Sequence, residues 1–180
     1  MGVDPGFANL GLACAYLDTF GRPQLLDARV VRTKKAGRKE KRLDEDLRRR
    51  LGEISDAVVG YIREHDPALV VFESMAWVRN ASASAKMGLA WGAAFAVARA
   101  FELATDVYAP KEIKIGCGLK ATASKVEVEA AVKEAFKNSP FQNWPTTKII
   151  EHAADAAAAI ITAARDERWR VIFKARSGRL

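Results

Sequence analysis

A short apolar run limits what this chain can fold into more than any other segment does. The run is PALVVFE at residues 67–73, which opens with proline and ends on Glu73. A run of this kind is typical of a strand buried in the middle of a sheet. Residues 10–17 and 24–32 predict two more strands, joined as a hairpin across the turn DTFGRP. We therefore expect a sheet built around a buried central strand.

Helical patterns alternate with these strands along the chain. Leu43, Leu47 and Leu51 open an amphipathic pattern over 43–64. Short strands are expected at Asp4 and at 106–110, and further helices at 79–104, 124–137 and 147–165. This order predicts an α/β fold of three layers, in which a mixed five-stranded sheet has helices on both faces. We expect a single domain over residues 1–165, followed by a basic tail over 166–180.

The second predicted helix carries small residues four positions apart. Gly88, Gly92 and Ala96 leave one of its faces almost without side chains. We therefore expect another element to approach this face closely.

Positive charge is concentrated in two parts of the chain. Residues 32–50 hold ten Lys or Arg against four Asp or Glu, and residues 165–180 hold six against two. The net charge is +7, with a pI near 9.6. This balance suits a polyanionic partner, above all nucleic acid, although a solvated and soluble surface has the same composition.

The composition also bears on compartment and membranes. Cys14 and Cys117 stand alone, without C-x-x-C spacing. Such cysteines indicate reduced thiols in a cytosol-like compartment, not a disulfide scaffold or a zinc site. No apolar run approaches the length of about 18 residues that a membrane span needs, so no membrane contact is expected.

Four polar side chains stand in segments that are otherwise apolar or rich in glycine. Asp4 lies in GVDPG, where a short strand meets a Pro-Gly turn, and Glu73 closes the run LVVFE. His152 and Asp155 lie three positions apart in the alanine-rich run EHAADAAAAI, and so on one face of a predicted helix. Each also has an ordinary explanation, as a turn residue, an exposed strand end or the polar edge of a helix.

Taken together, these residues suggest a metal site. Three carboxylates that converge without lysine partners repel one another, and their pKa values rise. Two divalent cations about 3.5–4 Å apart would resolve this conflict and activate water for phosphodiester hydrolysis. Oxygen ligands favour Mg²⁺ or Mn²⁺, and an imidazole is tolerated beside them.

Four motifs, in this order, resemble the RuvC family of Holliday junction resolvases within the RNase H-like nuclease superfamily. They are GVDPG, VFES with RNASASAKMGLAWGAAFAVA, GCG with ASKVEV, and HAADAAAAI. The resemblance runs from about residue 2 to residue 163, which is almost the whole chain.

The resemblance implies a crossover junction endodeoxyribonuclease with an RNase H-like fold. It implies a homodimer that binds a four-way DNA junction, because a two-fold junction matches a two-fold dimer. Two metal ions in each active site would support paired symmetric nicks that leave 5′-phosphate ends, and a branch-migration motor is a further partner to expect. The implied ligands are Asp4, Glu73, His152 and Asp155, and His152 is also a candidate proton acceptor.

The resemblance also assigns residues around the ligands. Lys125 would neutralise charge on the scissile phosphate, unless it is simply a surface lysine at a helix start. The family has one lysine before its Gly-x-Gly stretch, and both Lys111 and Lys114 fit that place. Trp77 is either an aromatic residue that stacks on junction bases or a core residue. Phosphate contacts are also expected from Arg79, Asn80 and Lys86.

Other functions stay open at the level of sequence. The nearest is another nuclease of the superfamily: a branched-DNA debranching enzyme, including one of phage origin, or an RNA-processing nuclease. GVDPGFANLG also resembles the phosphate loop of actin-like ATPases and sugar kinases, which need two such domains and a longer chain. A non-catalytic DNA-binding module is the third, and the basic tail is either an added DNA contact or a disordered end. The expected location is the cytoplasm of a bacterial or phage-infected cell, with an organelle as the alternative.

Overall fold

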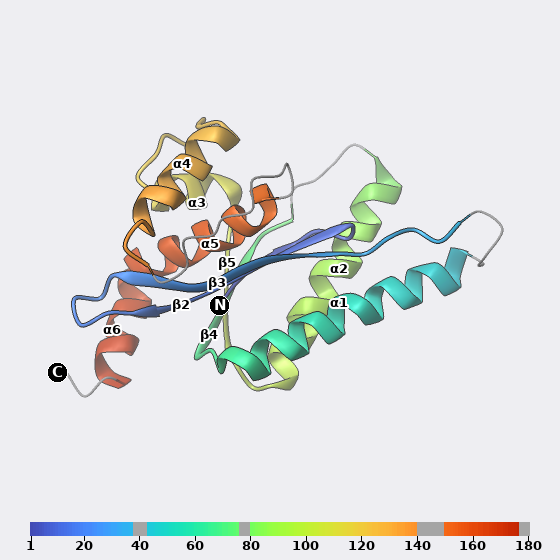
Figure 1. The fold of residues 1–180 in the computed structure, drawn as a ribbon, viewed down its shortest axis with the longest axis horizontal. Helices are drawn as coiled ribbons and strands as arrows, with labels where there is room; N and C mark the ends of the chain where they lie inside the picture. Colours follow the sequence, from blue (N-terminus) through green and yellow to red (C-terminus); the bar gives the residue numbers. More distant parts are fainter. Residues whose placement is uncertain (38–42, 76–79, 140–149, 177–180) are drawn as a thin grey trace.

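A mixed five-stranded sheet forms the centre of the molecule (Figure 1). The computed structural model describes residues 1–37, 43–75, 80–139 and 150–176. The strands are β1 (Gly2–Pro5), β2 (Asn9–Leu17), β3 (Pro23–Arg32), β4 (Leu69–Glu73) and β5 (Ala104–Tyr108), in the order β3-β2-β1-β4-β5. The first three pair antiparallel, whereas β4 runs parallel to both β1 and β5. The predicted hairpin, buried strand and mixed sheet are confirmed.

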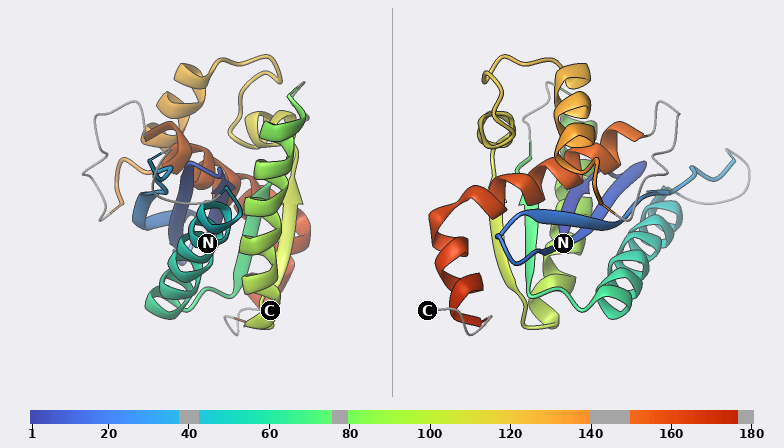
Figure 2. Two further views of the ribbon diagram at one scale, coloured as in Figure 1. Left: turned by 90° about the vertical axis from the view of Figure 1, so that its right-hand side faces the viewer. Right: turned by 60° about the vertical axis from the view of Figure 1, so that its left-hand side comes forward.

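Helices cover both faces of this sheet, as Figure 2 shows from two sides. On one face, α1 (Leu43–His65) and α2 (Ala81–Ala100) pack over a core that includes Val3, Phe72 and Ile54. On the other face, α5 (Ile150–Arg165) packs on the sheet, and α3 (Pro110–Gly116) and α4 (Lys125–Ala135) pack on α5. The predicted three layers are therefore confirmed. Each strand contributes to the cores on both sides because its residues alternate between the two faces of the sheet.

Helix α3 was not expected from the sequence. The prediction extended a strand to residue 110 and placed no helix between there and residue 124, whereas β5 ends at Tyr108 and α3 begins at Pro110. Proline suits the first helical position because its missing N–H has no partner there. The carboxylate of Glu112 accepts a hydrogen bond from the backbone N–H of Ala109 at 2.6 Å, which closes the first turn. Seven residues are too few to show a helical period in sequence.

The expected basic tail forms a further helix, α6 (Glu167–Arg176). Trp169 and Phe173 pack against the core beneath α5. The indole N–H of Trp169 donates to Asp106 at 2.6 Å, and the hydroxyl of Tyr108 donates to Asp166 at 2.7 Å. The idea of a disordered end is therefore wrong as far as residue 176. No helix among the described residues is long and apolar enough to cross a membrane.

Candidate functional site

Three carboxylates meet at one edge of the sheet. Asp4 lies in β1 and Glu73 ends β4, the strand beside it; Asp155 reaches the same place from α5. One carboxylate oxygen from each residue can be chosen so that all three oxygens lie within 4.8 Å of one another. The β1–β4 register pairs Val3 with Phe72, so the next residue on each strand, Asp4 and Glu73, points to the α5 side of the sheet.

The approach of α5 to the sheet depends on two glycines. A β-carbon on Gly2 would overlap the backbone carbonyl of Ala156, and one on Gly11 would overlap the backbone carbonyl of His152. Ala156 and His152 are one helical turn apart, so α5 rests its backbone on neighbouring strands at two successive turns. The buried alanines of α5 complete this close contact: Ala153, Ala154, Ala156, Ala157, Ala158 and Ala159.

This packing also fixes the position of the first turn of α5. Gly11 pairs with Asp4 across β1 and β2, and the backbone of His152 lies on Gly11. His152 is thereby held directly beside Asp4. The alanine-rich composition of the run follows from its place, because larger side chains on this face would lift α5 away from the carboxylates.

The negative charges of the three carboxylates lie close together and are only partly compensated by neighbouring cations. Burial, followed by the charges of Asp4 and Asp155, raises the pKa of Glu73 to about 8. Burial and the charge of Asp4 raise the pKa of Asp155 to about 6. Lys125 and His152 oppose both shifts but do not cancel them. Bringing all three groups to the charged state therefore costs free energy that a bound cation would offset.

His152 lies beside this group and is joined to it through Asp4. Its Nδ1 lies 2.6 Å from Oδ2 of Asp4, and its Nε2 lies 3.4 Å from the amide nitrogen of Asn9. A proton on Nδ1 satisfies both contacts, since the carboxylate only accepts and the amide nitrogen only donates. The hydrogen bond to Asp4 is the main cause that raises the pKa of His152.

Lys125 is the first residue of α4, and its ammonium group lies near enough to interact with the charges of Asp155 and Asp4. Its Nζ lies 3.3 Å from the carboxylate of Glu151, the residue that precedes His152. The side chain of Lys125 is 70% exposed, so it can turn toward a substrate that arrives from solvent. Lys125 is therefore near the carboxylates but is paired outside their cluster.

The other residues singled out from the sequence lie on different elements. Asn80 caps α2, and its side-chain oxygen accepts from the backbone N–H of Ala83 at 3.1 Å. Lys86 is exposed on the second turn of α2, and Lys111 and Lys114 lie on α3, the first exposed and the second partly buried. The positions of Trp77 and Arg79 lie outside the described residues. Contact of these residues with DNA stays a prediction.

Two neighbours of the site were missed by sequence reasoning. Asn9 begins β2 and reaches His152, and Glu151 pairs with Lys125. The signal for Glu151 was present, because it precedes His152 directly in the chain. Asn9 becomes visible only when the β1–β2 register is known, since that register lays Asn9 near the end of β1.

A second acidic cluster provides a contrast. Among the described residues, Asp27, Glu64 and His65 also offer ligand atoms within 4.8 Å of one another. There, however, the guanidinium of Arg29 pairs with Asp27 and binds both carboxylate oxygens of Glu64, at 3.0 and 3.1 Å. Arg29 therefore neutralises the negative charge of this second cluster. The cluster of Asp4, Glu73 and Asp155 has the donor set that hard divalent cations prefer. Because these carboxylates are partly buried, a bound cation would stabilise their charged forms more strongly than it would at an exposed site.

Comparison with known proteins agrees with this geometry. The family model described as crossover junction endodeoxyribonuclease RuvC matches residues 1–163. The curated RuvC of Solidesulfovibrio magneticus is 35% identical over 129 residues, which cover 70% of this chain and 70% of that protein.

Solved structures agree with the same assignment. The Thermus thermophilus RuvC structure is matched with a TM-score of 0.71 at 26% identity, covering 98% of this chain and 95% of that one. The structure of T. thermophilus RuvC in complex with a Holliday junction substrate is matched at 0.70 and 25% identity, covering 99% and 95%. The expected RNase H-like fold is therefore confirmed. With a family model that spans nearly its whole length, the chain belongs to the RuvC family of crossover junction endodeoxyribonucleases.

Proposed function

We propose that this protein resolves four-way DNA junctions by paired symmetric nicks, as a metal-dependent endonuclease that leaves 5′-phosphate ends. Members of its family are crossover junction endodeoxyribonucleases, and a relative has been solved with a Holliday junction substrate. The observation that carries the proposal is the convergence of Asp4, Glu73 and Asp155 at one edge of the sheet. A non-catalytic DNA-binding module would have no use for three mutually repelling carboxylates.

The ligands of the metal would be Asp4, Glu73, His152 and Asp155. We propose Mg²⁺ or Mn²⁺ as the cofactor, with two ions per active site, because the donors are mainly carboxylate oxygens. When bound, such ions supply Lewis acidity and an activated water for phosphodiester hydrolysis. The raised pKa values of Glu73 and Asp155 support this, since a cation restores their charged forms.

His152 and Lys125 have distinct tasks in this proposal. His152 is a candidate proton acceptor because its ring lies in a hydrogen-bonded position between Asp4 and Asn9. Lys125 would leave Glu151 and face the scissile phosphate, where its ammonium group neutralises developing negative charge. Its exposure and its single salt-bridge partner among the described residues are compatible with that movement.

The junction itself would be bound by residues around this edge. The proposed contacts are Trp77, as a stacking residue, and Arg79, Asn80, Lys86, Lys111 and Lys114, as phosphate contacts. Lys86 and Lys111 have exposed ammonium groups. Such contacts give affinity that depends on salt, because each one releases counterions from DNA.

We also propose that the protein acts as a homodimer built on α2. A helix that packs on one side normally has a polar outer face. The outer stripe of α2 is instead small and apolar: Ala85, Leu89, Gly92 and Ala96. Leu89 is 42% exposed, and none of the described residues comes within 4 Å of a β-carbon placed on Gly92.

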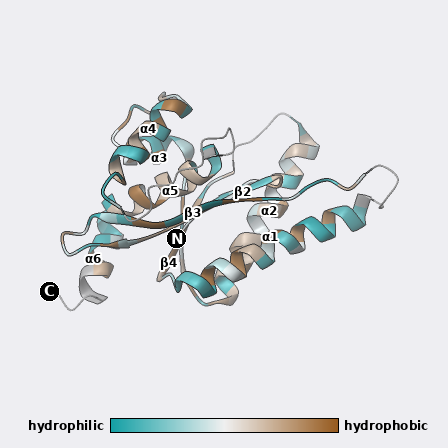
Figure 3. Cartoon of the chain, viewed as in Figure 1, coloured by the Kyte–Doolittle hydropathy of each residue, from teal (hydrophilic) through white to brown (hydrophobic). Residues whose placement is uncertain are grey.

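The sequence predicted that another element would closely approach the small residues on one face of α2. No described element closes over Gly92, so the close partner expected there is supplied in our proposal by α2 of a second copy. In Figure 3, α1 carries both hydrophilic and hydrophobic turns, whereas much of α2 is pale. A two-fold pairing of this kind would give one active site for each of two symmetry-related strands.

The remaining proposals concern the location of the protein, a partner and the bounds of the domain. We propose the cytoplasm of a bacterial or phage-infected cell as the location, in keeping with bacterial relatives and two free cysteines. A branch-migration motor would cooperate with the junction-bound dimer. Residues 1–165 would form the nuclease domain, with α6 packed against it as a C-terminal addition.

A panel of substrates tests this function. The purified protein would be incubated with a mobile four-way junction, plain duplex, a flap and an RNA–DNA hybrid, each with Mg²⁺, Mn²⁺ or EDTA. Cleavage confined to the junction, dependent on either metal and lost with EDTA, supports the proposal. Equal cleavage of flap or hybrid would contradict it and assign a nuclease of broader structure selectivity.

A further inference from the structure

From the last residue of β3 the chain continues as a segment with positive charge, here called the basic arm (residues 32–37); Thr33 in it is buried, whereas its cationic side chains are exposed. Asp4 pairs with Gly11, and Gly11 pairs with Val30, so the arm leaves β3 at the same edge of the sheet as the carboxylates. Figure 1 draws it as an extended continuation of β3 that runs alongside the first turns of α1. The arm therefore projects outward from the catalytic edge.

The arm is fastened at its base by a buried arginine. Arg50 of α1 is 7% exposed; its Nε donates to the hydroxyl of Thr33 at 2.9 Å and its Nη2 to the carbonyl of Thr33 at 3.1 Å. The guanidinium also stacks on the ring of Phe7, 4.1 Å from its centroid, in the turn that follows β1. One buried cation thus ties the arm to α1 and to the loop next to Asp4.

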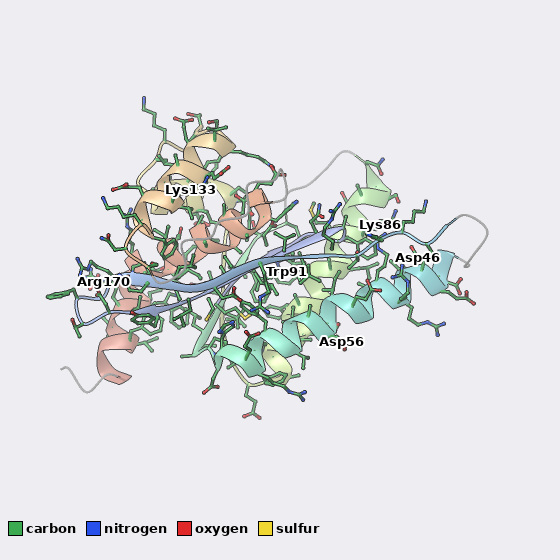
Figure 4. The ribbon with its side chains drawn as sticks, viewed as in Figure 1. Asp46, Asp56, Lys86, Trp91, Lys133 and Arg170 are labelled. Atoms are coloured by element: carbon green, nitrogen blue, oxygen red, sulfur yellow. The ribbon has the colours of Figure 1, made fainter. Side chains whose placement is uncertain are left out.

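Two further contacts hold the arm along α1. Asp46, also 7% exposed, accepts from the backbone N–H of Ala36 at 3.0 Å, and this bond is the main cause that lowers its pKa. Arg49 donates to the backbone carbonyl of Lys34 at 2.6 Å. Figure 4 labels Asp46 on α1, near the outer end of that helix. Buried ionic groups are costly unless they are satisfied, and here they fix the backbone of an exposed segment.

The side chains that this backbone presents are cations. Arg32, Lys34 and Lys35 are all exposed. Within the part of the chain that the structure describes, none of the three forms a salt bridge, whereas Arg49 and Arg50 pair with Asp46. The contacts of the backbone therefore leave three positive charges, unpaired among the described residues, on a fixed support.

We propose that the basic arm is a second DNA contact, which binds the phosphate backbone of a duplex arm of the junction outside the cleavage site. Its reach follows from the register: Lys35 is five residues beyond Val30, or about 16 Å along an extended chain. With about 3.4 Å of duplex axis per phosphate on one strand, this reach corresponds to roughly five phosphates. The inference rests on the proposed function for the identity of the DNA, but the contact is made by residues outside the active site.

The test measures binding and not cleavage. Junction affinity would be measured in EDTA over a range of salt concentrations for the wild type and for Lys34→Ala/Lys35→Ala. We expect about tenfold weaker binding and a salt slope reduced by roughly two, because each lysine removed would leave one phosphate without its cation. The matched control is Arg63→Ala/Arg170→Ala, which removes the same charge at the opposite edge of the sheet and should leave the slope unchanged.

A second measurement locates the contact. Single phosphates of the junction would be replaced, one at a time, by uncharged methylphosphonates at successive distances from the crossover. In the wild type, replacement about five phosphates out should weaken binding about threefold or more, and the double lysine variant should lose this sensitivity. Equal salt slopes, or the same methylphosphonate profile in both proteins, would overturn the inference. Cleavage with Mg²⁺, assayed separately, reports on the proposed function, so the two failures are distinguishable.

Discussion

The backbone carbonyl of His152 lies where a β-carbon of Gly11 would stand. This contact joins the first turn of α5 to the strand that pairs with Asp4, and it sets how near Asp155 comes to Glu73. The geometry of the proposed active site therefore depends on the lack of a side chain at Gly11 in β2.

Gly11→Ala should therefore damage the site more than its size suggests. The added methyl group meets backbone, which cannot rotate away, so α5 must shift. We expect a loss of about 1–3 kcal/mol in unfolding free energy and a fall in cleavage of about 100-fold or more. Gly60→Ala is the matched control, because none of the described residues comes within 4 Å of its β-carbon in α1. It should raise stability by about 0.5–1 kcal/mol and leave cleavage unchanged. Equal cleavage by both variants would contradict the role of this contact.

The stability of the metal-free protein should fall as pH rises. The pKa of Glu73 is raised from its ordinary 4.5 to about 8, and that of Asp155 from 3.8 to about 6. Between these limits the folded protein holds more protons than the unfolded chain, so the unfolding free energy decreases with pH.

The neutral variant Glu73→Gln isolates this effect. In EDTA, its melting temperature should decline less than that of the wild type between pH 5 and pH 8, and Mg²⁺ should stabilise the wild type more at pH 8 than at pH 5. Parallel melting curves for the two proteins across this range would show that Glu73 does not carry a raised pKa.

Leu89→Glu should separate the dimer. It places a charge in the apolar stripe of α2, where two copies are proposed to meet, so sedimentation should show a monomer at micromolar concentration. The monomer should retain its fold but lose paired nicking. Val126→Glu is the control, since Val126 is also apolar and is 76% exposed, but lies on α4. A dimer that persists in the Leu89 variant would move the interface elsewhere.

Helix α6 should contribute to stability although it lies at the end of the chain. Trp169→Ala removes a side chain that packs on the core and donates to Asp106. We expect a loss of about 2–3 kcal/mol, and so a melting temperature lower by roughly 5–10 °C. Val171→Ala on the same helix should change little, because Val171 is 55% exposed. If both variants have the same melting temperature as the wild type, α6 is not part of the folded domain.

The sequence predicted the layers of this fold because its strands and long helices repeat with clear periods. It predicted that Asp4, Glu73, His152 and Asp155 lie near one another, since two stand at the ends of strands and two share a helix face. It did not predict α3, which is too short to show a helical period. It also did not predict α6, in which the apolar residues Trp169 and Phe173 stand between charged residues. Contacts such as Asn9 with His152 depend on strand register, which the local pattern does not specify.

The most direct test of the central claim is cleavage of a cruciform in a supercoiled plasmid, for the wild type, Asp155→Asn and the control Asp27→Asn. Two nicks within one bound complex linearise the plasmid, whereas a single nick relaxes it and removes the cruciform. We predict linear product with symmetric ends for the wild type and for Asp27→Asn, only with Mg²⁺ or Mn²⁺, and junction binding without cleavage for Asp155→Asn. Nicked circles alone from the wild type, or full cleavage by Asp155→Asn, would contradict the account.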